Sequence, residues 1–217
     1  MSLADRIDAV QERIARAAQS AGRDAREITL LAVTKVFPVD ALLEAYSCGL
    51  REFGENYVQE FEGKYPSVAA LDGARFHLIG HLQSNKARKA AELFHVLQTV
   101  DSLKLARRLV EAGFSGEAFV EVKLSEEDSK HGAAPETLGE LLANSPLPLT
   151  GLMTMPPWSD DPEVARPYFR NLKKLADQHG ITKLSMGMSH DLEVAIQEGA
   201  TIVRIGTALF GSRKALL

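Results

Sequence analysis

The stretch "LLAVTKVFP" at residues 30–38 decides how the rest of the sequence is interpreted. Its four leading apolar residues read as the interior of a buried strand, which is predicted to end on Lys35 before Pro38 stops the pattern. Period-two alternation puts Lys35 on the same face as Val33 and Leu31. A lysine at the tip of a buried strand is costly to desolvate, so it needs a partner, a reaction or a route for its ammonium group to solvent.

This strand begins a regular alternation of strands and helices. A helix over residues 39–49 follows it, and seven further strand–helix pairs come after that. The predicted strands cover residues 28–35, 51–55, 74–80, 95–100, 117–124, 149–155, 183–187 and 201–206. Such alternation is typical of right-handed βαβ units and a parallel sheet. Eight units in about 190 residues predict an α/β protein with a single compact (β/α)8 TIM barrel.

Two further features bear on the architecture. An open doubly wound sheet is the alternative, but no G-x-G-x-x-G follows the first strand, which argues against a dinucleotide-binding version. An extra N-terminal helix over residues 1–22, capped by Ser2 and ended by Gly22, is predicted from one stripe of apolar side chains: Ile7, Val10, Ile14 and Ala17 or Ala18. No linker divides the chain, so residues 1–217 are expected to form one domain.

The composition is that of an ordinary globular domain, with 45% hydrophobic and 25% charged residues. A net charge of -4 gives no general attraction to nucleic acid or anionic membranes, so neither is expected as a partner. The N-terminal segment lacks the unbroken apolar core of a signal peptide or membrane anchor, and a cytoplasmic location is predicted. The single cysteine, Cys48, excludes an internal disulfide and a cysteine-rich metal site, and no metal is expected.

Functional residues of such a barrel gather at the carboxyl ends of its strands. A partly dehydrated Lys35 there would have a lowered pKa and could attack an aldehyde, whereas a lysine that only reaches solvent is the alternative. After strand seven, "SMGMSHDLE" places Gly187 and Ser189 before a helix that Ser189 is predicted to cap. After strand eight, Gly206 and Thr207 form a second small-residue turn. Because these two loops usually bind phosphate, the set predicts a phosphorylated aldehyde as ligand.

Arg204 adds information about that ligand. It alternates with Ile202 on the last strand, so both side chains are expected to face the barrel interior. An inward arginine is costly without a partner, and a buried ion pair with Glu55 or Glu121 is one explanation. The other is a pyridine ring, because a cation beside its nitrogen disfavours the pyridinium and makes the ring a weak electron sink.

Several stretches match a known family, and they follow the expected order over nearly the whole chain. They are "LLAVTK", "FGENYVQE", "FHLIGHLQSNK", "SKHG", "GLMTM", "LSMGMSHDLEVAI" and "VRIGTALFG". With them the chain resembles the pyridoxal phosphate homeostasis proteins (YggS-type). Their barrel is similar to the N-terminal domain of alanine racemase, so the resemblance implies a fold-type III barrel without the C-terminal β domain.

The resemblance implies that Lys35 carries pyridoxal 5'-phosphate (PLP) as an internal aldimine and that Arg204 faces the pyridine nitrogen. Asn56 and Met153 should lie near the ring. The residues implied around the phosphate are Ser185, Gly187, Ser189, Gly206 and Thr207. It further implies a PLP-binding protein of vitamin B6 and amino-acid balance, for which PLP-dependent client enzymes are candidate partners. The chain is expected to be a monomer.

No catalytic residue is assigned. Racemases of this fold type take a second acid–base group from an additional β domain and a partner subunit, whereas this chain ends soon after strand eight. His81, His131 and Tyr57 are candidates within the barrel, but nothing pairs one of them with the far face of the ring. Cofactor binding with little or no turnover, and so no enzyme, is therefore predicted. The alternatives are a slow PLP-dependent amino-acid racemase and a cofactor-free aldolase that uses Lys35.

Overall fold

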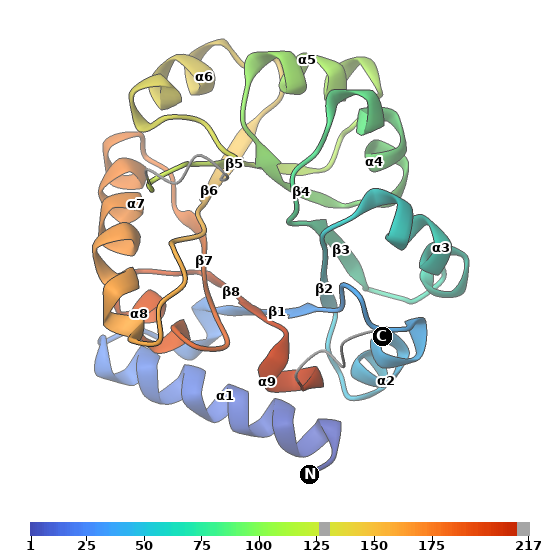
Figure 1. Ribbon diagram of the computed structural model, residues 1–217, viewed down its shortest axis with the longest axis vertical. Coiled ribbons are helices and arrows are strands. Elements are labelled where there is room, and N and C mark those ends of the chain that lie inside the picture. Colours follow the sequence, from blue (N-terminus) through green and yellow to red (C-terminus); the bar gives the residue numbers. More distant parts are fainter. Residues whose placement is uncertain (126–130, 212–217) are drawn as a thin grey trace.

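Eight parallel strands close into one barrel in the order of the sequence, from β1 to β8 (Figure 1). The computed structural model describes residues 1–125 and 131–211, so half of the "SKHG" stretch lies outside the described residues. The strands are β1 Thr29–Val33, β2 Glu52–Glu55, β3 Arg75–Leu78, β4 Val96–Val100, β5 Glu117–Glu121, β6 Leu149–Met153, β7 Lys183–Met188 and β8 Ile202–Ile205. The predicted (β/α)8 barrel is confirmed, and the open doubly wound sheet is wrong.

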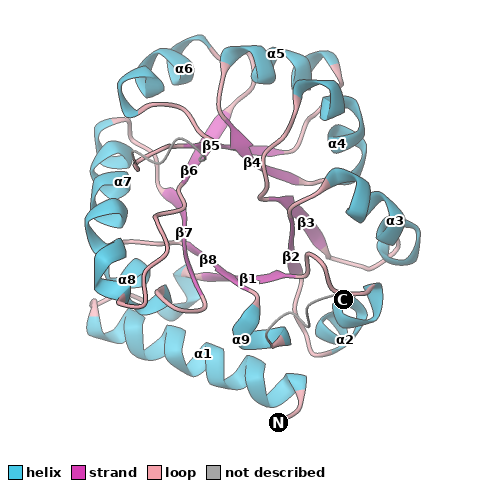
Figure 2. Cartoon of the chain, in the orientation of Figure 1, coloured by secondary structure: helices cyan, strands magenta, loops and turns pink. Residues whose placement is uncertain are grey.

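The helices form a ring outside the strands (Figure 2). They are α1 Leu3–Ser20, α2 Val39–Ser47, α3 Val58–Val68, α4 Ala87–Leu93, α5 Leu103–Glu111, α6 Leu138–Asn144, α7 Arg166–Gln178, α8 Leu192–Gln197 and α9 Thr207–Phe210. The barrel closes where β1 pairs with β8, with Leu31 opposite Arg204. None of the helices in the described ranges has both the length and the apolar character needed to span a bilayer.

Alternation along the strands divides the apolar residues into two cores. The larger one lies between strands and helices and includes Ala32 and Phe53. A small separate cluster, to which Leu31 and Phe119 belong, fills the barrel interior. The inward face predicted for Leu31 is therefore found, and the polar side chains that share it, such as Arg204, lie inside the barrel as well.

The end of β1 differs from the prediction. The strand ends at Val33, and Lys35 lies in a turn closed by a hydrogen bond from Phe37 N to Thr34 O of 3.2 Å. Val36 follows with a φ of 62°, which is unfavourable for a β-branched residue. The prediction that the strand continues to Lys35 is wrong, because the backbone enters this turn directly after Thr34.

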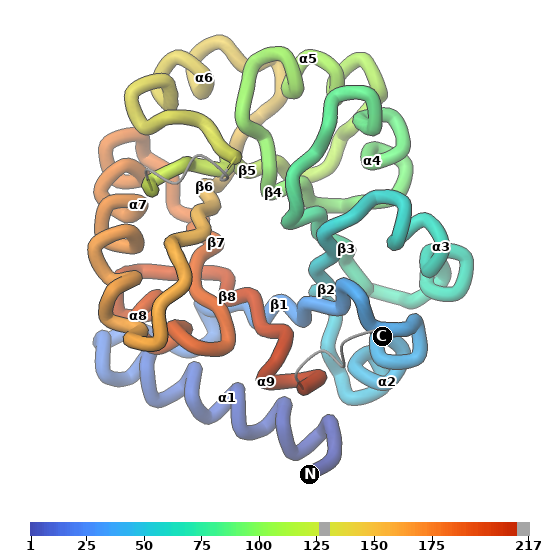
Figure 3. Tube along the Cα trace, in the orientation of Figure 1, coloured from blue at the N-terminus to red at the C-terminus, as the bar shows by residue number. Residues whose placement is uncertain are grey.

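Helix α1 is the additional N-terminal helix, and its trace lies along α8 and α9 (Figure 3). Ser2 caps it in a capping box with Asp5, as expected for the cap. Arg13 forms two hydrogen bonds to the Glu193 carboxylate, of 2.6 and 2.8 Å, and one of 3.0 Å to Ser189 O. The helix is thereby attached to the loop that follows β7.

Candidate functional site

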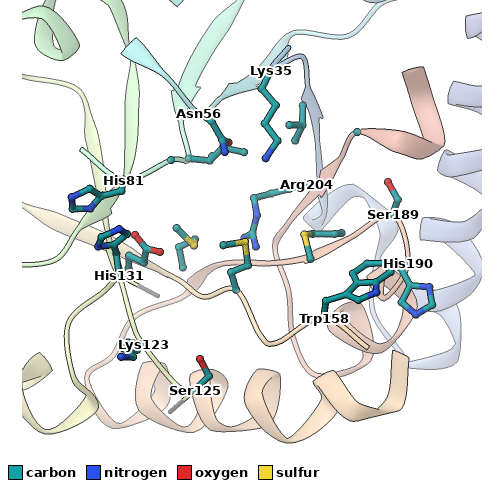
Figure 4. A pocket seen from close by; sticks show the side chains of 18 of the residues that line it. Lys35, Asn56, His81, Lys123, Ser125, His131, Trp158, Ser189, His190 and Arg204 are labelled. Carbon is teal, nitrogen blue, oxygen red and sulfur yellow. The ribbon is translucent and has the colours of Figure 1, made fainter. Parts of the chain in front are cut away.

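A cavity of about 410 Å³ opens at the carboxyl ends of the strands, a size typical of small-molecule sites. Lys35 and Arg204 both project into it (Figure 4). Seven of the nine residues predicted to contact a cofactor line this cavity: Lys35, Asn56, Met153, Ser189, Arg204, Gly206 and Thr207. The residues collected from the carboxyl ends of the predicted strands thus come together from five strands and their loops.

The other two predicted residues, Ser185 and Gly187, are not on the cavity wall. Ser185 is fully buried on β7 beneath Arg204. Gly187 has a φ of 92°, and a β-carbon there would lie 2.4 Å from Ala195 Cβ of α8. Glycine is therefore needed so that β7 can turn closely against α8. Both residues shape the cavity from the layer behind it.

Arg204 is buried and held by oxygen atoms of neighbouring strands. Nη1 donates to Ser185 O at 2.7 Å and Ser185 Oγ at 3.0 Å, and Nη2 donates to Thr154 O at 2.9 Å. These bonds use three of the five guanidinium hydrogens and leave two for a ligand. Burial lowers the pKa of Arg204 to about 10, so the group still carries its charge at neutral pH.

The ion pair between Arg204 and Glu55 that the sequence suggested is wrong. Glu55 faces away from the barrel interior and forms its ion pair with Lys64 at 2.9 Å. Glu121 does lie on the cavity wall, but its charge only attracts Arg204 from a distance, without a salt bridge among the described residues. Buried backbone and hydroxyl oxygens, and not a carboxylate, satisfy the arginine.

Glu121 is a site residue that the sequence pointed to only as a partner of Arg204. It is 8% exposed, and its Oε2 atom is buried without a hydrogen-bond partner. Burial raises the pKa of Glu121 to about 7, although the charge of Arg204 opposes this effect. Its place on β5, two residues after the inward Phe119, was a sequence signal for an inward side chain. Near neutral pH the cavity therefore contains a carboxyl group poised between its two protonation states.

The turns after β7 and β8 contact each other at the cavity. Ser189 Oγ accepts a hydrogen bond of 3.2 Å from Ala208 N in the first turn of α9. The predicted role of Ser189 as the cap of the next helix is wrong, because α8 begins at Leu192 and Asp191 precedes it. The Asp191 side chain accepts from Met188 N at 2.6 Å instead. The two small-residue turns thus form one continuous wall.

A buried network behind β1 supports the turn that carries Lys35. Lys64 of α3 is 8% exposed, and its Nζ donates to Thr34 O at 3.0 Å. The same Nζ contacts Glu55 Oε1 at 2.9 Å and Glu60 Oε1 at 2.7 Å. Burial raises the pKa of Glu55, while Lys64 opposes that rise. The turn is therefore fixed from outside the barrel by charged side chains that a ligand would not touch.

The same network reaches the residue after the lysine. Glu60 Oε1 accepts a hydrogen bond of 2.6 Å from Val36 N, the residue with positive φ. Thr34 Oγ1 donates to Glu55 Oε1 at 2.7 Å. Both neighbours of Lys35 in the chain are thus tied to α3 or β2. Strained backbone held in this way by its surroundings is common at functional sites.

The predicted acid–base candidates separate into two groups. His81 and His131 line the cavity and stack, with ring centroids 3.7 Å apart. Burial and the nearby His131 lower the pKa of His81. Tyr57 does not line the cavity and is 58% exposed. Trp158 also lines the cavity, with its ring centroid 5.1 Å from that of His190.

Asn56 is held close to the strand that follows it. A β-carbon added to Gly80 would lie 2.2 Å from Asn56 O, so only glycine allows this approach. The loops after β2 and β3 therefore pack backbone against backbone at the cavity. This contact places Asn56 beside Lys35 (Figure 4).

The chain was compared with known proteins. Residues 6–214 match the family model described as "Alanine racemase, N-terminal domain". A pyridoxal phosphate homeostasis protein of Pseudomonas aeruginosa is 46% identical over 98% of this chain and 96% of its own length. One of the same name from Aquifex aeolicus is 42% identical over 99% of this chain and its whole length.

Solved structures agree with these matches. A structure described as PipY of Synechococcus elongatus with PLP bound is similar with a TM-score of 0.82 and 35% identity, over 97% of this chain and all of that one. An alanine racemase of Clostridium difficile shares the fold at a TM-score of 0.71 and 15% identity, and the match covers 58% of that chain. The protein described here therefore belongs to the pyridoxal phosphate homeostasis protein family, which has the fold of the alanine racemase N-terminal domain.

Proposed function

We propose that this protein binds PLP covalently through Lys35 and acts in PLP homeostasis, with little or no catalytic turnover. The observation that carries the proposal is the joint projection of Lys35 and Arg204 into one cavity walled by two small-residue turns. The names of the relatives and the description of PipY with PLP bound support the choice of ligand.

The residues present fit this ligand. Lys35 supplies a primary amine for the aldehyde, and the two remaining guanidinium hydrogens of Arg204 can face the ring nitrogen. Ser189, Gly206 and Thr207 lie where the phosphate is expected in such barrels. Asn56 and Met153 would lie along the ring, with Ser185 and Gly187 behind the wall. When bound, PLP supplies an electrophilic carbonyl joined to a ring that can accept electrons.

Arg204 bears on how reactive the bound group would be. Because an arginine that retains its charge disfavours a second positive charge nearby, it would keep a facing pyridine nitrogen unprotonated. Its three hydrogen bonds to strand oxygens hold it in this role. An unprotonated ring is a weak electron sink, which suits storage of the cofactor better than turnover of amino acids.

The placement of the acid–base candidates also supports low turnover. Racemisation needs proton donors and acceptors on both faces of the substrate carbon. Tyr57 does not line the cavity, and His81 and His131 stack on each other on another side of the cavity from Lys35 (Figure 4). We include in the proposal a monomeric, cytoplasmic protein that passes PLP to PLP-dependent client enzymes.

A second lysine, Lys123, also lines the cavity and provides a control for covalent binding at Lys35. Purified protein mixed with PLP should show a visible absorbance that borohydride removes. Peptide mass spectrometry should then find the pyridoxyl group on Lys35. The Lys35→Ala variant should lose this label, whereas Lys123→Ala should keep it. A label that survives in Lys35→Ala at wild-type yield would contradict the proposal.

A second assay separates a carrier from a racemase. The loaded protein is incubated with individual L-amino acids, and both the chirality of the amino acid and the release of PLP are followed. The proposal expects at most stoichiometric cofactor release and no steady formation of D-amino acid. Continuous racemisation that disappears in Lys35→Ala would overturn the proposed homeostasis function and show that the protein is an amino-acid racemase.

A further inference from the structure

The barrel interior beneath Arg204 contains a row of polar side chains that cofactor binding does not itself use. Arg204 Nη1 donates to Ser185 Oγ at 3.0 Å, and Ser185 Oγ donates to Gln98 Oε1 at 2.5 Å. Gln98 Nε2 lies 2.9 Å from His77 Nδ1, and His77 Nε2 lies 2.5 Å from Glu52 Oε2. The row therefore crosses the barrel from the cavity to the opposite end, through β8, β7, β4, β3 and β2.

With a neutral His77, the two ends of the row fix the direction of every hydrogen bond in it. Arginine can only donate, and an ionised carboxylate can only accept. The Ser185 hydroxyl hydrogen must then point to Gln98, and the Gln98 amide must donate to His77 Nδ1. His77 in turn carries its proton on Nε2 and donates it to Glu52. A flipped Gln98 amide would set its carbonyl oxygen against the unprotonated His77 Nδ1.

Because these side chains are buried, the direction of the hydrogen bonds between them is hard to reverse. Gln98 and Ser185 have no exposed surface, and His77 is 2% exposed, so water cannot replace a lost partner. Burial lowers the pKa of His77, and the Glu52 carboxylate opposes this effect. The charges facing His77 are those of Glu52 on β2, Arg75 on β3 and Glu117 on β5. A neutral His77 with a fixed tautomer is consistent with these surroundings.

We propose that Glu52, His77 and Gln98 are positioning residues that hold the Ser185 hydroxyl as an acceptor for Arg204. Because the Ser185 hydrogen is committed to Gln98, its oxygen can face the guanidinium. Arg204 forms no salt bridge with a carboxylate in the described part of the chain, so it depends on such oxygens to stay in the cavity. That Arg204 faces a PLP ring rests on the proposed function. The direction of the hydrogen bonds from Arg204 to Glu52 is independent of it.

The first test needs no cofactor. Nitrogen-15 NMR of the histidine rings, with His77 assigned by its absence in His77→Gln, reports which ring nitrogen carries the proton. We expect His77 to be neutral with its proton on Nε2 in the wild type. In Gln98→Glu, whose carboxylate can only accept, Nδ1 should become protonated. A wild-type His77 protonated on Nδ1, or one that averages between both forms, would overturn the proposed direction.

The second test measures the effect on the cavity. Gln98→Leu removes the middle of the row, and Thr99→Val is the matched control. Thr99 is equally buried, is adjacent on β4 and has an Oγ1 atom without a partner. Gln98→Leu should weaken PLP binding roughly tenfold, the effect of one lost buried hydrogen bond, and shift the absorbance maximum of the bound cofactor. Thr99→Val should change neither.

The outcomes distinguish this inference from the proposed function. If the wild type binds no PLP, the proposed function fails, and the NMR test still decides the direction of the row. If the wild type binds PLP and Gln98→Leu behaves like Thr99→Val, the positioning role fails. Should Gln98→Leu not fold, Gln98→Met replaces it, because methionine keeps the unbranched shape but lacks the carbonyl oxygen that accepts from Ser185. The same absorbance shift is then expected, and an unshifted maximum would count against the proposal.

Discussion

Replacing Lys64 by methionine tests the support behind the Lys35 turn. Methionine keeps an unbranched side chain but removes the ammonium group that contacts Thr34 O, Glu55 and Glu60. Fully buried Glu55 would keep only its hydrogen bond from Thr34. Breaking a buried pair in this way costs about 3–5 kcal/mol. At about 2–4 °C per kcal/mol for a chain of this size, Tm should fall by about 6–20 °C.

Lys89 provides a matched control, because its ammonium group also contacts two carboxylates, those of Glu62 and Glu92. Its side chain is 43% exposed, and such exposed pairs contribute little to stability. Urea unfolding followed by circular dichroism gives both free energies. The double variant Lys64→Met with Glu55→Gln should regain more than half of the loss, because no buried carboxylate is left unpaired.

The covalent label links this network to function. If Lys64→Met displaces the turn, borohydride labelling of Lys35 by PLP should slow under conditions where the variant is still folded. Lys89→Met should label at the wild-type rate. Equal free energies of unfolding for Lys64→Met and Lys89→Met would refute the reasoning, since they would show that the buried network contributes no more than a surface pair.

Two other perturbations give clear expectations. The pKa of Glu121 is raised from 4.5 to about 7 by burial, so the unfolded chain releases this proton at lower pH than the folded one. The free energy of unfolding should therefore fall by up to about 3 kcal/mol between about pH 4 and about pH 8 on account of Glu121. Glu121→Gln should remove this part of the dependence in urea titrations, and an unchanged slope would contradict the raised pKa. Gly80→Ala should lower stability by about 1–3 kcal/mol and weaken PLP binding, because its methyl group would displace Asn56. Gly63→Ala in α3, where nothing lies within 4 Å, should instead stabilise by up to about 1 kcal/mol in thermal unfolding, and equal effects of the two would argue against the close contact.

The repeated alternation of short strand segments and helical segments was sufficient to predict the barrel, since most of the strands are apolar runs between turn residues. The two local errors have one cause. The turn after β1 is bonded at Thr34 O by Lys64 from 30 positions away, and the Ser189 hydroxyl bonds to Ala208 from 19 positions away. Local propensity contains no information about such partners, so the predicted strand end and helix cap followed the more common local choices.

The site residues likewise divide into those that the sequence could predict and those that it could not. Residues directly after strands could be collected because parallel strands bring their carboxyl ends together. The hydrogen-bond partners of Arg204 could not be predicted in this way. Two of the three are backbone carbonyl oxygens, and their direction depends on the register of β6, β7 and β8. Glu52, His77 and Gln98 did carry a signal, as polar residues at inward positions of predicted strands.

The attachment of α1 to α8 and α9 has a consequence for how the protein is completed during synthesis. Arg13 and Glu193 are 180 positions apart, so α1 leaves the ribosome long before its partners exist. Until then the apolar stripe of α1 has nothing native to cover it, a situation that exposes a nascent chain to aggregation or chaperones. Arg13 can fix the Ser189 loop only once the chain has emerged as far as α8. Closure of the barrel and maturation of the ligand site are therefore expected to be the same late event in the life of each new molecule.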